Sequence, residues 1–256
     1  MVSSFANFII TVSMSLDNNA FSGNIPSEIG GATSLAFFSM QKNQATGTIP
    51  SQINQLKNLH TLNLATNFLN GTIPSTGDMN SLVNLYLYQN QLTGTMPSML
   101  GDMKSLEIIF LSSNKLSGSI TPTLSNASAT LRGLYLSDNG LDGTIPATLC
   151  ALSTLHSLFL DTNYLTGSMP SCLGTLTLLQ KLYVFHNKLS GEVPTSIQEL
   201  RSLNGLGLEN NNFVGSVPLG ICRISALSDL WSDCGGSNPE IACTCCTTCC
   251  PSSSCQ

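Results

Sequence analysis

Charged residues are scarce in this chain of 256 residues. Nine Lys and Arg and 14 Asp and Glu make up 9% of it, and the formal net charge is −5. Because binding to phosphates requires clustered Lys and Arg, we expect no nucleic-acid partner. Apolar runs are short as well, since none reaches the roughly 18 residues that a transmembrane helix needs. No membrane span is therefore predicted within the chain.

Catalytic motifs are also missing. The sequence contains no G-x-S-x-G, P-loop, protein-kinase or H-E-x-x-H signature. The segment from Ser112 to Lys115 matches the S-x-x-K pattern of acyl enzymes, but it is one copy of a repeated segment. The three histidines, His60, His156 and His186, fall in three different repeats. We therefore expect no catalysis, no cofactor and no metal site.

What the sequence has instead is a repeat of about 24 residues. An Asn recurs nine times, at Asn19, Asn43, Asn67, Asn90, Asn114, Asn139, Asn163, Asn187 and Asn211. The spacing is constant except that Asn90 comes one position early and Asn139 one position late. Four residues after each Asn stands a Gly. Three residues after that Gly stands a Pro, except in the fifth copy, where Thr121 precedes Pro122. Apolar residues stand eight, five and three positions before each Asn, as at Leu59, Leu62 and Leu64, except that the first copy has Thr11 in the first of these positions. The consensus is LxxLxLxxNxLxGxIPxxLGxL.

This consensus resembles that of plant-type leucine-rich repeat (LRR) proteins, the kind found in receptor-like ectodomains and polygalacturonase inhibitors. The resemblance covers roughly residues 9–232. It implies an α/β-type solenoid, a right-handed superhelix with a parallel β-sheet on the concave face, of about nine 24-residue coils plus a partial C-terminal coil. The recurring Asn is then expected to form a ladder inside the stack, where its amide bonds to backbone groups of its own coil and the next.

One residue between the leucines of each L-x-L segment has to point away from the core, because side chains alternate along a strand. Five consecutive repeats place an aromatic residue there, and two more aromatics occupy the next outward position. The predicted ligand-binding rings are Tyr86, Tyr88, Phe110, Tyr135, Phe159, Tyr183 and Phe185. An aromatic surface roughly 20 Å long is typical of an interaction site. The alternative is that rings one coil apart only stack on one another and cover the sheet.

Charged residues are predicted to rim these rings. Asp138 and Asp161 lie one and two residues before the Asn of their repeats, His186 lies directly before its Asn, and Lys181 precedes Tyr183 by two residues. Carboxylates beside rings suit a cationic or hydroxyl-rich ligand, such as a basic peptide or a carbohydrate. Asp138 and Asp161 therefore belong to the predicted ligand-binding face.

Ten cysteines are unevenly spread along the chain. Cys150 and Cys172 fall on adjacent coils, where a disulfide with its Cα separation of about 4.4 to 6.8 Å can form. Their segments also resemble the paired cysteines of plant-type LRR ectodomains, although two buried thiols are an alternative. The other eight lie near the C-terminus and favour a disulfide-tied cap over a zinc site or lipidation. The predicted domains are a solenoid over residues 1–232 and a cysteine-rich cap or tail over residues 233–256.

The location of the protein has to be inferred from indirect signals. The start of the chain, MVSSFANFIITVSMSL, lacks the basic residues that open a signal peptide and runs into the first repeat. No cysteine-bearing N-terminal cap precedes that repeat, and a chain truncated from a longer protein would account for both features. Two N-x-S/T sequons make Asn70 and Asn126 predicted glycosylation sites. Together with the cysteines they favour an extracellular or cell-surface location in the secretory pathway.

The favoured function is a non-catalytic recognition module that binds a protein, a peptide or a glycan on the concave face. Such a module would be an ectodomain, or a fragment of one, from a receptor-like protein that is membrane-attached in a longer form. One alternative is a secreted inhibitor of a cell-wall hydrolase. Another is a structural or ice-binding surface protein, because the residue after each repeat Gly is Thr or Ser in seven of nine copies, including Thr72 and Thr95.

Overall fold

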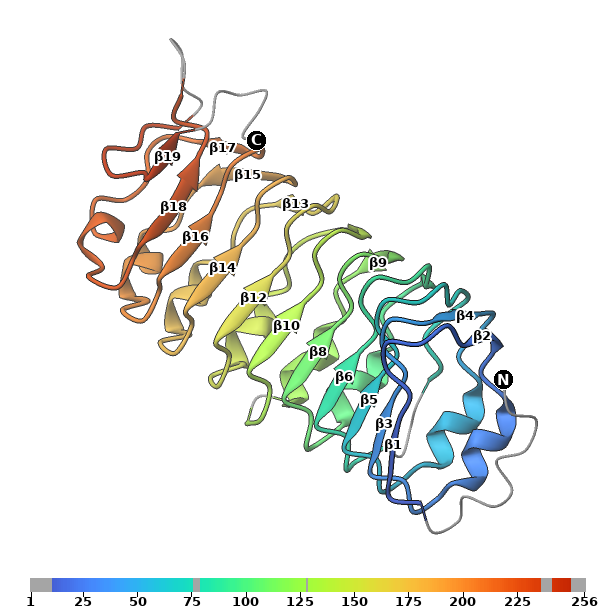
Figure 1. The fold of residues 1–256 in the computed structure, drawn as a ribbon. Helices are drawn as coiled ribbons and strands as arrows, with labels where there is room; N and C mark the ends of the chain where they lie inside the picture. Colours follow the sequence, from blue (N-terminus) through green and yellow to red (C-terminus); the bar gives the residue numbers. More distant parts are fainter. Residues whose placement is uncertain (1–10, 76–78, 128, 236–240, 250–256) are drawn as a thin grey trace.

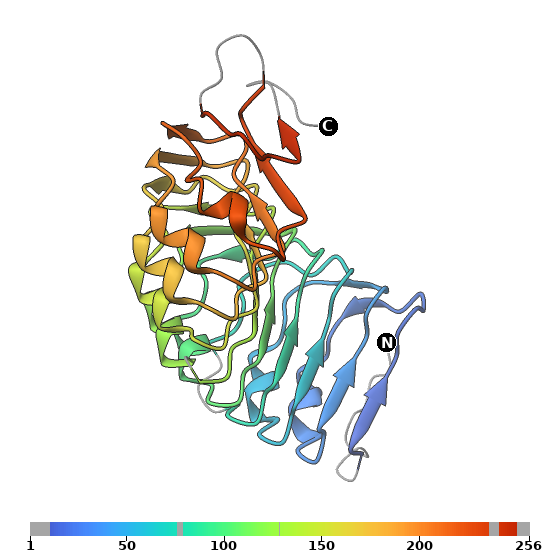
Figure 2. The same cartoon turned by 90° about the vertical axis from the view of Figure 1, so that its left-hand side faces the viewer.

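The computed structural model describes residues 11–75, 79–127, 129–235 and 241–249. These residues form a curved stack of coils, with one row of parallel strands along the stack and short helices on the other side (Figure 1, Figure 2). The expected LRR solenoid with a parallel sheet is confirmed. Among the described residues, each position of the repeat has its own place in the coil: in the sheet, in the core, in the helices or in the smaller sheets.

The largest sheet, which we call the concave sheet, contains eleven strands in chain order. They are β1 (Ser13–Ser15), β3 (Phe37–Ser39), β5 (Thr61–Asn63), β6 (Asn84–Tyr86), β8 (Ile108–Phe110), β10 (Gly133–Tyr135), β12 (Ser157–Phe159), β14 (Lys181–Tyr183), β16 (Gly205–Gly207), β18 (Asp229–Ser232) and β19 (Thr248–Cys249). Equivalent repeat positions pair directly, so that Leu134 lies between Ile109 and Leu158. Equivalent side chains therefore form columns that run along the stack.

The leucine columns fill the interior. Leu134, Leu136, Leu158 and Leu160 are fully buried, and the same holds for most equivalent positions in other coils. Each coil buries its leucines mainly against the coils before and after it. The core is therefore one continuous apolar column that runs along the stack.

Eight 3-10 helices line the side opposite the concave sheet. They are η1 (Ser27–Gly31), η2 (Ser51–Gln55), η3 (Ser98–Asp102), η4 (Pro122–Ala127), η5 (Ala147–Ala151), η6 (Ser171–Thr175), η7 (Thr195–Glu199) and η8 (Ile221–Arg223), counted among the described residues. In six of them the repeat Pro directly precedes the helix and holds an extended backbone, as Pro170 does with φ −61°. The fifth copy has Thr121 in that place, and there the Pro, Pro122, is instead the first residue of η4.

Smaller parallel sheets are formed by the chain between the concave strand and the helix of a coil. One pairs β2 (Ser22–Asn24) with β4 (Gln44–Thr46). A second contains β7 (Thr93–Gly94), β9 (Lys115–Ser119) and β11 (Gly140–Asp142), and a third contains β13 (Thr166–Gly167), β15 (Lys188–Glu192) and β17 (Asn212–Val214). The repeat Gly lies in or next to these strands with positive φ, for example 76° at Gly167.

The asparagine ladder explains where the concave strands end. Asn163 Nδ2 donates to the carbonyl oxygens of Leu160 in its own coil and Leu136 in the preceding coil, at 3.1 and 3.0 Å. Its Oδ1 accepts the amide N–H of Leu141, also in the preceding coil, at 3.0 Å. The same pattern recurs from Asn43 to Asn211. The side-chain amide was expected to bond to its own coil and the next one. It bonds to its own coil and to the preceding one, so the predicted direction between coils is wrong.

A left-handed residue precedes every ladder Asn. These nine residues have φ between 51° and 56° and are Asn18, Lys42, Thr66, Gln89, Ser113, Asp138, Thr162, His186 and Asn210. A side chain in this conformation costs roughly 1 kcal/mol or more. The ladder hydrogen bonds offset this cost, because the left-handed turn brings the side-chain amide of the Asn within reach of the carbonyl groups at the end of the strand.

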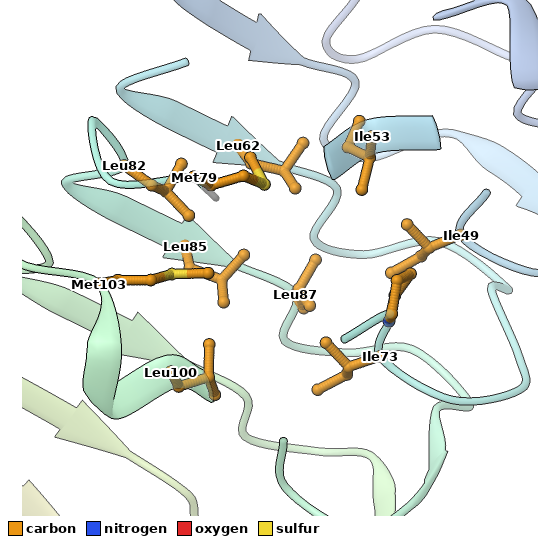
Figure 3. Close-up of a pocket in the computed structure, with 11 residues that line it drawn as sticks. Ile49, Ile53, Leu62, Ile73, Met79, Leu82, Leu85, Leu87, Leu100 and Met103 are labelled. Atoms are coloured by element: carbon orange, nitrogen blue, oxygen red, sulfur yellow. The ribbon is translucent and has the colours of Figure 1, made fainter. Parts of the chain in front are cut away.

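A small cavity of about 20 Å³ lies inside the stack, around the coil in which Asn90 follows Asn67 one position early. Figure 3 shows apolar side chains from three successive coils pointing toward this space, among them Leu62, Leu85 and Leu100. Because the described residues that line it have apolar side chains, they offer a water molecule no side-chain partner. The cavity is a gap in core packing and offers no ligand site.

The described part of the cysteine-rich tail continues the stack. In β19, Thr248 pairs with Trp231, and Ala242 pairs with Ser216. Three disulfides, Cys222–Cys245, Cys234–Cys249 and Cys243–Cys246, tie this segment together. The Sγ atoms of Cys234, Cys243 and Cys246 lie within 4.8 Å of one another, but each belongs to a disulfide rather than offering a thiolate to zinc. Cys250 and Cys255 lie outside the described residues.

Within the ranges that the structure describes, every helix is too short and insufficiently apolar to cross a membrane.

Candidate functional site

The middle outward position of the concave strands forms the column that the sequence singled out. From β1 to β18 its residues are Ser15, Ser39, Asn63, Tyr86, Phe110, Tyr135, Phe159, Tyr183, Gly207 and Trp231. The first three coils are small or polar, and aromatic residues follow. Their rings are half-buried while the flanking leucines are fully buried, so the rings lie on the sheet and face outward.

The aromatic residues of these strands, together with Tyr88 and Phe185 two residues further along their coils, are called the ring column. From Tyr88 onward their rings contact one another in sequence along the stack. Ring centroids lie 4.3 Å apart for Tyr88 and Phe110, 4.7 Å for Phe110 and Tyr135, and 5.0 Å for Tyr135 and Phe159. Phe159 continues to Tyr183 at 4.7 Å. Each spacing is close to the strand separation of about 4.8 Å, which is why one ring per coil gives unbroken contact.

Gly207 provides the space in which the column ends. Tyr183 and Trp231 are two strands apart, yet their rings stack at 5.7 Å with an interplanar angle of 7°. A Cβ on Gly207 would lie 2.8 Å from Phe185 Cδ1 and 3.2 Å from Tyr183 Cδ1. The absence of a side chain at this position therefore lets three rings close over the strand.

Trp231 was missed in the sequence, since the repeat was counted by its Asn and no Asn follows Trp231 at the expected spacing. The segment from Leu227 to Ser232 does keep two of the three apolar positions, and that signal could have extended the column by one coil. At the other end, Tyr88 accepts a hydrogen bond from Gln41 Nε2 at 2.5 Å. The ring surface thus reaches further toward the C-terminus than the predicted set.

A second outward column, two residues further along each coil, carries acids in the C-terminal half. It contains Asp161, Phe185, Glu209 and Asp233, and the three acids are 8%, 3% and 4% exposed. Asp161 Oδ1 accepts a hydrogen bond from Ser137 Oγ at 2.6 Å, and Asp233 Oδ1 accepts the amide of Asn210 at 2.9 Å. Glu209 and Asp233 were not in the predicted set, although Glu209 occupies the same repeat position as Asp161.

Burial shapes the electrostatics of this acidic column. It raises the pKa of Asp161 above the usual value, and the hydrogen bond from Ser137 only partly opposes this. Burial raises the pKa of Glu209 to about 7, and the nearby carboxyl groups of Asp233 and Asp161 add to the increase. Burial also raises the pKa of the Tyr86 hydroxyl. These groups border the ring column with little solvent to screen them.

Of the other predicted rim residues, Lys181 lies beside the ring column, whereas Asp138 and His186 lie beyond the strand ends. Asp138 is an exposed left-handed residue at the strand ends, where it lines an open polar groove with Thr162, His186 and Asn210. Lys181 lies on the concave sheet, where its Nζ is 5.7 Å from the Tyr183 ring centroid and donates to the Tyr183 hydroxyl at 3.3 Å. The structure therefore brings Asp161 and Lys181 to the ring column and leaves Asp138 at the edge of the sheet.

Cysteines and sequons occupy the helical side and the smaller sheets. Cys150 and Cys172 form a disulfide with a Cα separation of 5.7 Å between adjacent coils. Asn70 is exposed next to the repeat Gly of its coil, and Asn126 is exposed in η4, where it donates to Asp102 at 3.1 Å. Glycosylation of either Asn stays a prediction.

A different surface runs along the smaller sheets, and we call it the hydroxyl column. It consists of the residue after each repeat Gly: Asn24, Thr48, Thr72, Thr95, Ser119, Thr144, Ser168, Glu192 and Ser216. All nine are exposed. Parallel bridges pair Thr72 with Thr93 and Thr144 with Thr166, the residues just before the repeat Gly of the next coil, so successive members of the column do not lie directly opposite one another.

Comparisons with known proteins identify the repeat. The family model described as Leucine Rich Repeat matches residues 81–103, 105–127, 130–152 and 178–200. Against curated proteins, the chain has no match.

Several solved structures share the fold. The Arabidopsis receptor kinase HAESA, in complex with the peptide hormone IDA and the co-receptor SERK1, is 34% identical with a TM-score of 0.82, over 86% of this chain and 37% of that chain. PEPR1 with AtPEP1 is 34% identical with a TM-score of 0.74, over 86% and 34%. A plant ice-binding protein is 27% identical with a TM-score of 0.74, over 87% and 71%. This chain thus spans little more than a third of those receptor chains, and its repeats and structural likeness make it a leucine-rich repeat protein of the plant type.

Proposed function

We propose that the chain is a non-catalytic recognition module that binds a peptide segment of an extracellular partner along its ring column. The observation that carries this proposal is the unbroken series of half-buried rings from Tyr88 to Trp231 on the concave sheet. An exposed apolar surface of this extent is uncommon on a protein without a partner. The acids beside it give the surface a charge that a basic peptide would complement.

Similarity to ligand-binding ectodomains supports the proposal. HAESA was solved with the peptide hormone IDA and PEPR1 with AtPEP1, and both are 34% identical over 86% of this chain. An extracellular site of action agrees with the four disulfides among the described residues, because disulfides persist in oxidising compartments. A receptor-like parent protein and a membrane attachment outside this chain belong to the same proposal.

The test is selection of binders from a random peptide library on the immobilised chain. Affinities of the selected peptides are then compared between the wild type and a Phe110→Ala/Phe159→Ala variant. We expect a loss of about tenfold or more, since each ring supplies stacking area in the middle of the surface. A Thr48→Ala/Thr144→Ala variant, altered only in the hydroxyl column, is the matched control and should retain full affinity.

Ring packing without a binding role is the competing explanation, and the same experiment distinguishes it. Removing each ring costs about 1 to 2 kcal/mol of stability, because neighbouring rings lose contacts. The unfolding transitions of both variants are therefore measured first, and binding is compared at a temperature where both are folded. If the selected peptides bind both variants as tightly as the wild type, the ring column is not the binding surface.

A second candidate function is ice binding by the hydroxyl column. Seven of its nine residues are Thr or Ser, and all nine are exposed. The similarity to a plant ice-binding protein, which covers 71% of that chain, favours this candidate. A glycan on Asn70, two residues before Thr72, would cover part of this surface, so the two predictions compete at that position.

Inhibition of ice recrystallisation by unglycosylated protein tests the second candidate. Activity should fall when Thr72 and Thr95 are both replaced by Tyr, since bulky side chains disrupt a flat surface. It should survive the Phe110→Ala/Phe159→Ala substitutions. Absence of activity in the wild type at micromolar concentration excludes ice binding and leaves the ring column as the functional surface.

A further inference from the structure

The C-terminal end of the ring column contains a buried acid without a counter-ion. Glu209 is 3% exposed, and its Oε2 has no hydrogen-bond partner among the residues that the structure describes. Among the residues that the structure describes, the ion pair with an N···O distance within 4.0 Å joins Arg132 to Glu107, and it lies at least three coils before Glu209. A buried carboxylate with an unpaired oxygen is costly, and binding sites are where folded proteins retain such groups.

Aromatic rings surround this part of the concave sheet. Phe185 precedes Glu209 in the same outward column, and its ring lies 6.1 Å from the ring of Trp231. Tyr183 stacks on Trp231 across Gly207, in the strand that leads to Glu209. The faces of such rings attract cations, and more strongly where water is excluded.

Two further acids make the local charge strongly negative. Asp161 and Asp233 lie in the outward column of Glu209 on either side of it, and both are mostly buried. Lys181 donates to the Tyr183 hydroxyl, and the exposed His186 acts electrostatically on Asp161. Asp233 accepts the backbone N–H groups of Asn210 and Asn211, so the carboxyl group of Glu209 is the one left for a ligand to balance.

We propose that Glu209, together with the rings of Phe185 and Trp231, binds a guanidinium or primary ammonium group of the ligand. This rests on the concave sheet being the binding surface, and it names the ligand as a peptide with an Arg or Lys side chain at this end. A guanidinium can donate two hydrogen bonds to one carboxylate while its plane stacks on a ring. Glu209 supplies the acceptor, and the faces of the neighbouring rings attract the cation.

The chain contains its own reporter, because Trp231 is its single Trp. Its fluorescence is followed during titration with n-butylguanidinium and, separately, with the neutral isostere n-butylurea, at constant ionic strength and pH 8, where Glu209 with its pKa of about 7 is ionised. We expect a saturable change with the cation and none with the urea. Equal saturable responses to both compounds would overturn the proposal, since shape alone would then explain binding.

The matched substitutions are Glu209→Gln and Glu192→Gln. Glu209→Gln keeps the size of the side chain and removes its charge, so binding of n-butylguanidinium should weaken about tenfold or more. Glu192→Gln alters an exposed Glu of the hydroxyl column and should leave the titration unchanged. Undiminished affinity in Glu209→Gln would contradict the proposal, as would a lack of any wild-type response to the cation.

Failure of this inference is distinguishable from failure of the proposed function. The peptide-selection variant alters Phe110 and Phe159, which lie at least one coil away from Phe185 and Trp231. Selected peptides that depend on those rings while n-butylguanidinium does not bind would retain the ring column and remove the cation site. Binding of the cation without any ring-dependent peptide would give the opposite result.

Discussion

The concave sheet and the smaller sheets present opposite chemistry from the same repeating coil. On the concave side the outward positions change from small residues in the first three coils to contacting rings and buried acids in the later ones. On the other side the hydroxyl column keeps short polar side chains in most coils. The comparison shows that the interior is constrained to repeat, while the residues of each outward column vary independently of those of the other.

The interior ladder supports both surfaces, and breaking it should have the largest effect. Asn163→Leu leaves the amide of Leu141 and the carbonyls of Leu136 and Leu160 without this partner. Each unsatisfied buried group costs about 1 to 3 kcal/mol, so we expect a loss of roughly 3 kcal/mol or more in urea unfolding followed by circular dichroism.

Asn19 offers the matched control for that substitution. Among the described residues its side chain bonds only to Leu16 and Asp17 of its own coil, and it is exposed. Asn19→Leu should therefore cost less than about 1 kcal/mol. Similar losses for Asn19→Leu and Asn163→Leu would show that contacts between coils are not the source of the ladder's stability.

Gly207→Ala should disturb the concave surface alone. The added Cβ would meet Phe185 and Tyr183 at 2.8 and 3.2 Å, so the rings have to move and the stack of Tyr183 on Trp231 should open. We expect a cost of about 1 to 2 kcal/mol and a shift in Trp231 emission. In Gly31→Ala, where the new Cβ has no atom within 4 Å, stability should not fall. An unchanged emission spectrum in Gly207→Ala would contradict the role given to Gly207.

The acidic column should give the concave surface a pH dependence that the hydroxyl column lacks. The pKa of Glu209 is about 7 in the folded protein and 4.5 in its ordinary state, so between these values the folded state holds a proton that the unfolded chain has lost. The contribution of this bound proton to the stability of the folded protein is complete below about pH 4.5 and is lost as the pH rises through about 7. We expect wild-type stability to fall on the order of 2 kcal/mol more than that of Glu209→Gln between pH 5 and pH 8. Parallel pH profiles for the two proteins would show that Glu209 titrates normally.

The smallest effect is expected from the hydroxyl column. Thr72→Val/Thr95→Val changes two exposed side chains, and unfolding stability should stay within about 0.5 kcal/mol of the wild type. The response of Trp231 to n-butylguanidinium should not change either. A loss above about 1 kcal/mol would mean that these hydroxyls take part in the structure rather than only facing solvent.

The sequence predicts the layers of this fold because each layer has a residue-type pattern. The L-x-L segments place buried and outward residues, so the five central rings could be assigned to the concave sheet before the structure was known. The left-handed residue before each Asn has no such pattern: Lys42, Gln89 and His186 share a backbone conformation and no chemical property. The direction of the ladder is equally hidden, because an amide can bond forward or backward with the same sequence.

The functional end of the column was less predictable, since it depends on neighbours from different coils. Glu209 is charged and lies in an outward position, which ordinarily means exposure. It is nevertheless buried, two residues after Gly207, whose missing side chain lets the rings of Phe185 and Tyr183 close over the sheet. Such an effect requires three coils to be considered together, whereas a repeat alignment considers one position at a time.

The alternation of Tyr and Phe in the ring column sets a length scale for any ligand that lies along it. Tyrosine hydroxyls recur at Tyr86, Tyr135 and Tyr183, every second coil, which is about 9.6 Å by strand spacing. A polyproline II helix advances about 9.3 Å per turn of three residues. A ligand in that conformation would bring every third side chain to successive tyrosines, whereas a fully extended strand would drift out of step within a few residues.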